Sequence, residues 1–158
     1  MTIEQEIWQR PEIIQWSQLL LNSYEKLLGD RLIPRQENSE AEAKLLFFAP
    51  FVVVSHNTKS DPILNYGNQT SLELWQMNWQ DFIRTPSRFT AEKIEREERE
   101  KMLSKTARDG FIINYRGIRK TSQGKRFLIE GCTIWNVVDS RGVLKGQAAT
   151  FSQWSLLE

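Results

Sequence analysis

One stretch, residues 51–68 with the sequence FVVVSHNTKSDPILNYGN, constrains the fold more than any other part of the chain. Two apolar runs, Phe51–Ser55 and Ile63–Tyr66, flank a polar segment that contains the turn-forming pair Asp61-Pro62. This pattern favours a strand, a tight turn and a second strand. Asn68 follows just before a helical pattern, where Asn is a preferred N-cap residue. The stretch therefore predicts an antiparallel hairpin that leads directly into a helix.

Length and charge limit the class of protein. A chain of 158 residues suits one domain with a core of useful size. The formal net charge of +1 gives no argument for a nucleic-acid or membrane-surface partner. The first residues, MTIEQEIWQRPE, lack the apolar core of a signal peptide, and no apolar run approaches the ~18 residues that span a bilayer. The single cysteine, Cys132, excludes an internal disulfide and suits a reducing compartment. We therefore expect a cytoplasmic protein with no nucleic-acid and no membrane partner.

The N-terminal region predicts two helices followed by a loop. Thr2–Gln5 has the pattern of a capping box for a short first helix. Pro11 suits the first turn of a second helix and Gly29 suits its end. Apolar residues recur between them over a wide face, which requires burial, and residues 30–40 have loop composition. Two alternatives are open for the helix 11–28: it covers the sheet of its own chain, or it forms a homodimer interface.

The remainder of the chain predicts a helical middle and a three-stranded meander. Further helices are expected over residues 40–48, after Asn68, after Asn78, and from Thr90 to Arg108 with an end at Asp109-Gly110. Within the last of these, the mixed-sign run Glu95–Lys101 is typical of a solvated helix face. Strands are expected over Phe111–Lys120, Arg126–Val138 and Gly146–Trp154, with turns at 121–124 and 139–142. Such spacing suits neighbouring antiparallel strands.

The order of two strands, a helical middle and three strands resembles the PAS architecture. More closely, six short segments resemble the MEKHLA domain family: VVVSHNT, DPILNYGN, PSR at 86–88, DGFI at 109–112, YRGIR at 115–119 and GQAATFSQW at 146–154. The resemblance covers roughly residues 10 to 155. The run MEKHLA itself is absent, which indicates the stand-alone bacterial branch of the family.

This resemblance implies an α+β fold with a PAS-like five-stranded antiparallel sheet and helices on one face. It divides the chain into an N-terminal helical cap, residues 1–40, and a PAS-like domain, residues 41–158. It also implies a sensory or interaction role without an established enzymatic activity.

The lone histidine and the lone cysteine give little support for a cofactor. His56 lies in the predicted turn region, where a structural hydrogen bond and a ligand contact are both open, and one histidine makes a poor metal site because zinc takes about four ligands. The Asn-Cys-Arg-Phe-Leu-Gln motif of flavin-binding LOV domains is absent, and no helix carries a haem-binding histidine. Cys132, in the middle of a strand, is interpreted as a small buried hydrophobe. No flavin, haem or metal cofactor is therefore predicted.

Strand alternation places a candidate ligand site on the concave side of the sheet. Residues two apart share a face, so Ile113, Tyr115, Gly117 and Arg119 form one set and Phe127, Ile129, Gly131, Thr133 and Trp135 form the other. By analogy with PAS sheets both sets face the helices, with volume left at the two glycines, while Leu128, Cys132 and Ile134 pack under the N-terminal helix. The candidate ligand-binding residues are Tyr115, Arg119, Thr133 and Trp135, with His56 and Trp75 beside them. Arg119 would need a buried acid such as Glu73 or an anionic ligand, and a filled core with Arg119 reaching solvent is the alternative.

Three functions remain open from the sequence. The first is a non-catalytic PAS-like sensory domain that binds a small molecule or a protein partner. The second is a homodimerisation module with a filled core. The third is a small α+β enzyme, although neither a nucleophile–base pair nor a phosphate-binding glycine motif is present.

Overall fold

A computed structural model describes residues 6–157, so the capping box predicted at Thr2–Gln5 lies outside the described residues. The elements follow the chain in the order η1 (Ile7–Gln9), α1 (Pro11–Leu28), α2 (Ser39–Phe47), β1 (Val52–His56), β2 (Leu64–Gly67), α3 (Gln69–Trp75), α4 (Trp79–Phe82), η2 (Ser87–Thr90), α5 (Lys93–Asp109), β3 (Phe111–Lys120), β4 (Arg126–Val138), β5 (Leu144–Phe151) and β6 (Gln153–Leu156). The sequence predicted the α+β class and nearly every one of these elements. The predicted domain boundary at residue 40 falls inside α2.

The strands form one antiparallel sheet in the order β2-β1-β5-β4-β3, and β6 pairs with β4. The N-terminal hairpin therefore joins the C-terminal meander through the pairing of β1 with β5. Long-range pairing of this kind brings His56 of β1 directly opposite Gln147 of β5.

Side-chain and backbone caps fix the helix ends. Gly29 ends α1 with a left-handed φ of 71°, a conformation that costs glycine little. The Asn68 side chain accepts a hydrogen bond from Ser71 N at the start of α3, and Asn78 caps α4 in the same way. The predicted start of the long helix at Thr90 is wrong, because Ser87–Thr90 forms a separate 3-10 turn before α5.

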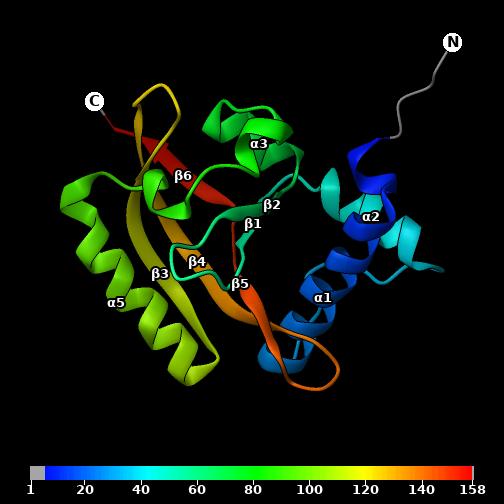
Figure 1. The fold of residues 1–158 in the computed structure, drawn as a ribbon. Helices are drawn as coiled ribbons and strands as arrows, with labels where there is room; N and C mark the ends of the chain where they lie inside the picture. The colour runs from blue at the N-terminus through cyan, green and yellow to red at the C-terminus, as the bar shows by residue number, and fades with distance from the viewer. Residues whose placement is uncertain (1–5, 158) are drawn as a thin grey trace, which may run out of the picture.

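Helices cover both faces of the sheet (Figure 1). The helix α5 lies along β3 and β4 on one face, and α1 with α2 lies on the opposite side. Two contacts tie α1 to the sheet: Ser23 Oγ donates to Val138 O at 2.9 Å, and Trp16 Nε1 donates to Ser55 Oγ at 2.9 Å. The apolar face of α1 therefore covers the sheet of its own chain, the first of the two alternatives left open by the sequence. Within the described residues, no helix is both long and apolar enough to cross a membrane.

The last strand was predicted as one segment, Gly146–Trp154, but it is broken at Ser152 into β5 and β6. β5 pairs with the second half of β4, from Thr133 onward, and β6 pairs with the first half, Phe127–Glu130. The break lies opposite a bulge in β4 at Gly131, whose φ is +64°. The bulge bends β4, and its partner strand follows the bend by breaking in two.

Candidate functional site

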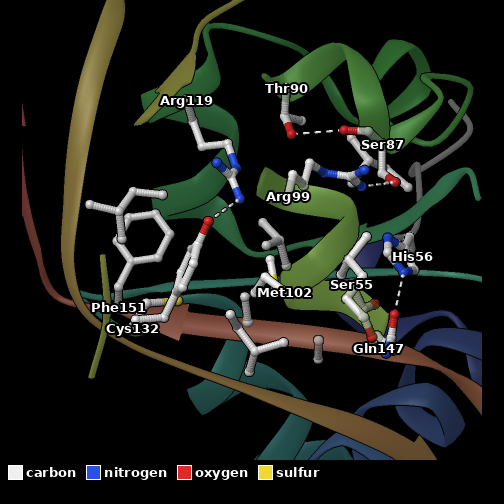
Figure 2. Close-up of a pocket in the computed structure, with 18 of the residues that line it drawn as sticks. Ser55, His56, Ser87, Thr90, Arg99, Met102, Arg119, Cys132, Gln147 and Phe151 are labelled. Atoms are coloured by element: carbon white, nitrogen blue, oxygen red, sulfur yellow. Dashed lines mark hydrogen bonds between the residues drawn. The ribbon is translucent and has the colours of Figure 1, made fainter. Parts of the chain in front are cut away.

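A partly open cavity of about 80 Å³ lies between α5 and the sheet. Figure 2 shows its polar side chains converging from β1, α5, β3 and β5. Most of its wall is apolar, with Leu64, Phe82, Met102, Ile129 and Phe151 among the lining residues. A cavity with apolar walls and a few convergent polar groups is the usual form of a ligand site.

His56 contributes a neutral imidazole to one end of the cavity. It is the last residue of β1 rather than part of the turn, and Gln147 faces it from β5, with 3.2 Å between His56 Nε2 and Gln147 Oε1. Gln147 Nε2 donates to Leu103 O and Asn136 Oδ1, which turns its amide oxygen toward the histidine. Because that oxygen can only accept, His56 Nε2 carries the proton and Nδ1 holds a lone pair. Burial, and then the positive charge of Arg99, lower the pKa of His56 to about 4.

The Arg99 side chain extends from α5 and lines the cavity (Figure 2). Its side chain is only 4% exposed. Arg99 Nη2 donates to Ser87 Oγ, and Nη1 lies 3.1 Å from Glu100 Oε1, a carboxylate that is 65% exposed. Burial, followed by repulsion from Arg119, lowers the pKa of Arg99 to about 10, so the guanidinium stays charged at neutral pH.

Arg119 and Tyr115 form the β3 side of the cavity. Arg119 is 6% exposed and donates to its neighbour's carbonyl, Ile118 O, at 2.8 Å and to Tyr115 Oη at 3.1 Å. Tyr115 in turn donates to Glu98 Oε2 at 2.6 Å. Burial is the first cause that raises the pKa of Tyr115 to about 12, which keeps the phenol protonated as that donor. A hydrogen-bonded chain therefore leads from the cavity to the exposed side of α5.

Four of the six predicted ligand-binding residues line the cavity: His56, Trp75, Tyr115 and Arg119. Trp75 packs edge-on against Phe82, Phe127 and Phe151, with ring centroids 5.4 to 6.2 Å apart. Its buried Nε1–H has no hydrogen-bond partner among the described residues.

The prediction that Cys132 and Ile134 pack under the N-terminal helix is wrong, because both line the cavity. Tyr115 pairs with Cys132 and Gly117 pairs with Ile129, so two residues of β4 stand opposite one residue of β3. This is a β-bulge, and it shifts the alternation of β4 by one residue. Burial raises the pKa of the Cys132 thiol to about 12, which fits the predicted role of a buried hydrophobe.

The same shift overturns the placement of Thr133 and Trp135, neither of which lines the cavity. The Trp135 ring packs on α1 instead, edge-on to Tyr24 with the ring centroids 5.0 Å apart. Thr133 pairs with Thr150, whose hydroxyl donates to Val52 O. These residues belong to the face that the N-terminal helix covers.

The prediction that Gly117 and Gly131 leave volume on the concave side is also wrong. A Cβ at Gly117 would stand 2.6 Å from Tyr115 Oη, so the tyrosine ring already occupies that space. Gly131 is exposed and serves the bulge, since few other residues adopt its positive φ. Ile113 does not share the face of Tyr115 either: it is 56% exposed, and Ile112 pairs with Ile134 in its place.

Sequence reasoning missed Arg99, Ser87 and Gln147, which supply most of the remaining polar lining. Arg99 was interpreted as part of a solvated charged run. A usable signal was present, because Arg99, Met102 and Thr106 recur at helical spacing and form the buried residues of α5. Among residues 6–157, no cluster of three or more His, Cys, Asp or Glu side chains could hold a metal ion.

A family model for the MEKHLA domain matches residues 14–156. The chain belongs to the MEKHLA domain family. This match confirms the family that the short segments of the sequence indicated. A comparison with curated proteins gives no match.

Solved structures confirm the PAS-like fold of this MEKHLA domain. A PAS domain of a protein from Colwellia psychrerythraea matches with a TM-score of 0.63 at 13% identity, over 75% of this chain and 95% of that one. A light-oxygen-voltage domain studied with a flavin analogue matches with a TM-score of 0.58 at 15% identity, over 75% and 85%. An RNA-binding light-oxygen-voltage receptor matches with a TM-score of 0.59 at 15% identity, over 75% of this chain and 34% of that one. At these identities the likeness concerns the fold alone.

Proposed function

We propose that this MEKHLA domain is a non-catalytic sensory domain that binds a small molecule in the cavity between α5 and the sheet. The observation that carries the proposal is the convergence of His56, Arg99 and Arg119 on a cavity whose other walls are mostly apolar. Burying a polar group costs free energy unless the group is hydrogen-bonded. The presence of three such groups around one cavity therefore supports a binding role.

The chemistry of the lining groups supports binding rather than catalysis. A general base works best with a pKa near the working pH, whereas the pKa of His56 is lowered to about 4. A cysteine nucleophile reacts as a thiolate, whereas the pKa of Cys132 is raised to about 12. Neither group is prepared for acid–base or nucleophilic work at neutral pH.

The size of the cavity argues for a small ligand. Ligand pockets for drug-sized molecules usually measure about 300–1,000 Å³, and this one measures about 80 Å³. A single buried water molecule needs a cavity of roughly 10–15 Å³. The cavity is too small for the ring system of a flavin, so we propose that the ligand is not the flavin of the light-oxygen-voltage domains that share the fold.

Filling the cavity provides the test. Ala149 lines the cavity, and Ala107 is exposed on α5, so Ala149→Leu and Ala107→Leu make the same change inside and outside it. We expect native mass spectrometry of wild-type protein, and of Ala107→Leu, to retain a small molecule that Ala149→Leu loses. Equal retention by all three proteins would place the ligand elsewhere, and a wild-type protein that binds no small molecule in a thermal-shift screen would refute the proposal.

A further inference from the structure

The cavity holds two buried cations and no buried acid. Arg99 and Arg119 are the only charged residues among the cavity-lining side chains of the described chain, since no aspartate or glutamate lines it and His56 is neutral. Both arginines are at most 6% exposed. A buried charge is costly unless a partner of opposite sign is present, and neither arginine has such a partner inside the cavity.

Three carboxylates come into question for this role, and none of them lies inside the cavity. Glu100, the ion-pair partner of Arg99, is its neighbour on α5 and is mostly in solvent. Glu98 reaches Tyr115 and bonds to Arg119 only through that phenol. Glu73, the internal acid that the sequence suggested for Arg119, accepts a hydrogen bond from Gln69 at the surface instead.

The donors of the two arginines are only partly used. Within the described residues Arg99 donates to Ser87 and Glu100, and Arg119 donates to Ile118 O and Tyr115 Oη. A guanidinium offers five N–H donors, so several remain for a ligand. In Figure 2 the two guanidinium groups approach the same upper part of the cavity, with the apolar wall below them.

We infer that the ligand is a small organic monocarboxylate, whose carboxylate lies between Arg99 and Arg119 and whose carbon chain lies against Met102 and Ile129. The inference rests on the proposed binding function and names its ligand class. Guanidinium groups match the two oxygens of a carboxylate, and one negative charge offsets the repulsion between the two cations. Benzene, with six heavy atoms, fits a cavity of about 150 Å³, so a cavity of about 80 Å³ suits an acid of about two or three carbons.

A comparison of acids with their uncharged amides tests whether binding requires the carboxylate. Acetate, propionate and butyrate are titrated against the protein in a carboxylate-free buffer, beside acetamide, propionamide and butyramide, with binding followed by NMR chemical shifts. At least one acid should bind, and its amide should bind more than tenfold more weakly. Arg99→Gln and Arg119→Gln should each weaken the acid by about ten- to a hundredfold, because each removes a charge-assisted hydrogen bond. Arg108→Gln, a matched change at an exposed arginine of α5, should leave binding unchanged.

Each other outcome overturns the inference. Equal binding of an acid and its amide would remove the carboxylate from the ligand while leaving the cavity as a binding site. Acid binding that survives both arginine changes would place the acid elsewhere. If no acid binds, or if the protein binds inorganic phosphate more tightly than every acid, the ligand is not a monocarboxylate. The proposed binding function would still hold if native mass spectrometry showed a small neutral molecule retained by the protein. If Arg99→Gln does not fold, Arg99→Lys keeps the charge and should bind the acid at intermediate strength.

Discussion

Acidification should destabilise the fold through a single histidine. His56 is the only histidine in the chain and is 7% exposed. The groups that face it are Arg99 from α5 and Gln147 from β5, and no carboxylate among the described residues lines the cavity beside it. Burial and the arginine both oppose the imidazolium form, which lowers the pKa of His56 to about 4 from an ordinary value near 6.5.

The sign and size of the effect follow from linkage. Between pH 6.5 and about 4 the unfolded chain binds a proton at His56 that the folded chain does not bind. The stabilisation is therefore fully present above pH 6.5 and is lost as the pH falls toward 4. Each pH unit in this window is worth about 1.36 kcal/mol, so the loss approaches about 3 kcal/mol by pH 4.

Urea denaturation between pH 7 and 4.5, on wild type and His56→Gln, measures this contribution. Glutamine can still donate to Gln147 but cannot titrate, so the difference between the two proteins isolates the histidine from the carboxylates. The wild type should lose about 2.5 kcal/mol more than the variant by pH 4.5. The imidazole NMR signal of the folded protein should also titrate far below 6.5. Parallel pH profiles, or an imidazole that titrates near 6.5, would refute the argument.

Three other changes test the rest of the fold. Arg35 is the first cause that lowers the pKa of Glu42 to about 2, so Glu42→Gln should cost about 2 kcal/mol at pH 7. The variant should also lose less stability than the wild type between pH 4.5 and 2, and urea denaturation measures both effects. Asn68, fully buried, hydrogen-bonds Val53 N, Leu46 O and Phe51 O as well as capping α3, so Asn68→Ala should cost about 3 kcal/mol or more. Deleting residues 1–28 should uncover the sheet face under α1 and cause aggregation, which sedimentation would detect. A soluble truncated monomer with an unchanged melting temperature would contradict this. The purified protein should show no flavin or haem absorption and no bound zinc.

The sequence was sufficient for the topology because local signals mark nearly every element boundary. Asn68 and Asn78 mark two helix starts, Gly29 marks a helix end, and the strands β3 and β4 begin and end where their turn residues predict. These signals depend on backbone chemistry at single positions and do not need knowledge of distant contacts. Part of the cavity followed as well, because Tyr115 and Arg119 lie on a strand whose pairing with β4 is determined by the turn that follows it.

The rest of the polar lining depended on partners that are far apart in the sequence. Arg99 is surrounded by charged neighbours along the chain, and its side of α5 is buried because the helix packs against β3 and β4. Gln147 is an ordinary strand residue until the pairing of β5 with β1 places it opposite His56, 91 residues away. The helical spacing of Arg99, Met102 and Thr106 is the one local sign of the buried side of α5, and the contact of Gln147 with His56 leaves none, so a charged run and a strand glutamine were given their commonest interpretation.

The bulge at Gly131 shows how one residue decides the composition of the site. Without it, strict alternation along β4 would direct Thr133 and Trp135 into the cavity and Cys132 toward α1, as the sequence predicted. The extra residue reverses that order, so the cavity gains a small thiol in place of an indole, and the tryptophan becomes the platform on which Tyr24 of α1 packs. An indole is far larger than a thiol, so a tryptophan side chain on this face would fill much of a cavity of about 80 Å³ and leave little room for a ligand. The open volume beside the two arginines therefore exists because a glycine with positive φ interrupts the strand between Ile129 and Cys132.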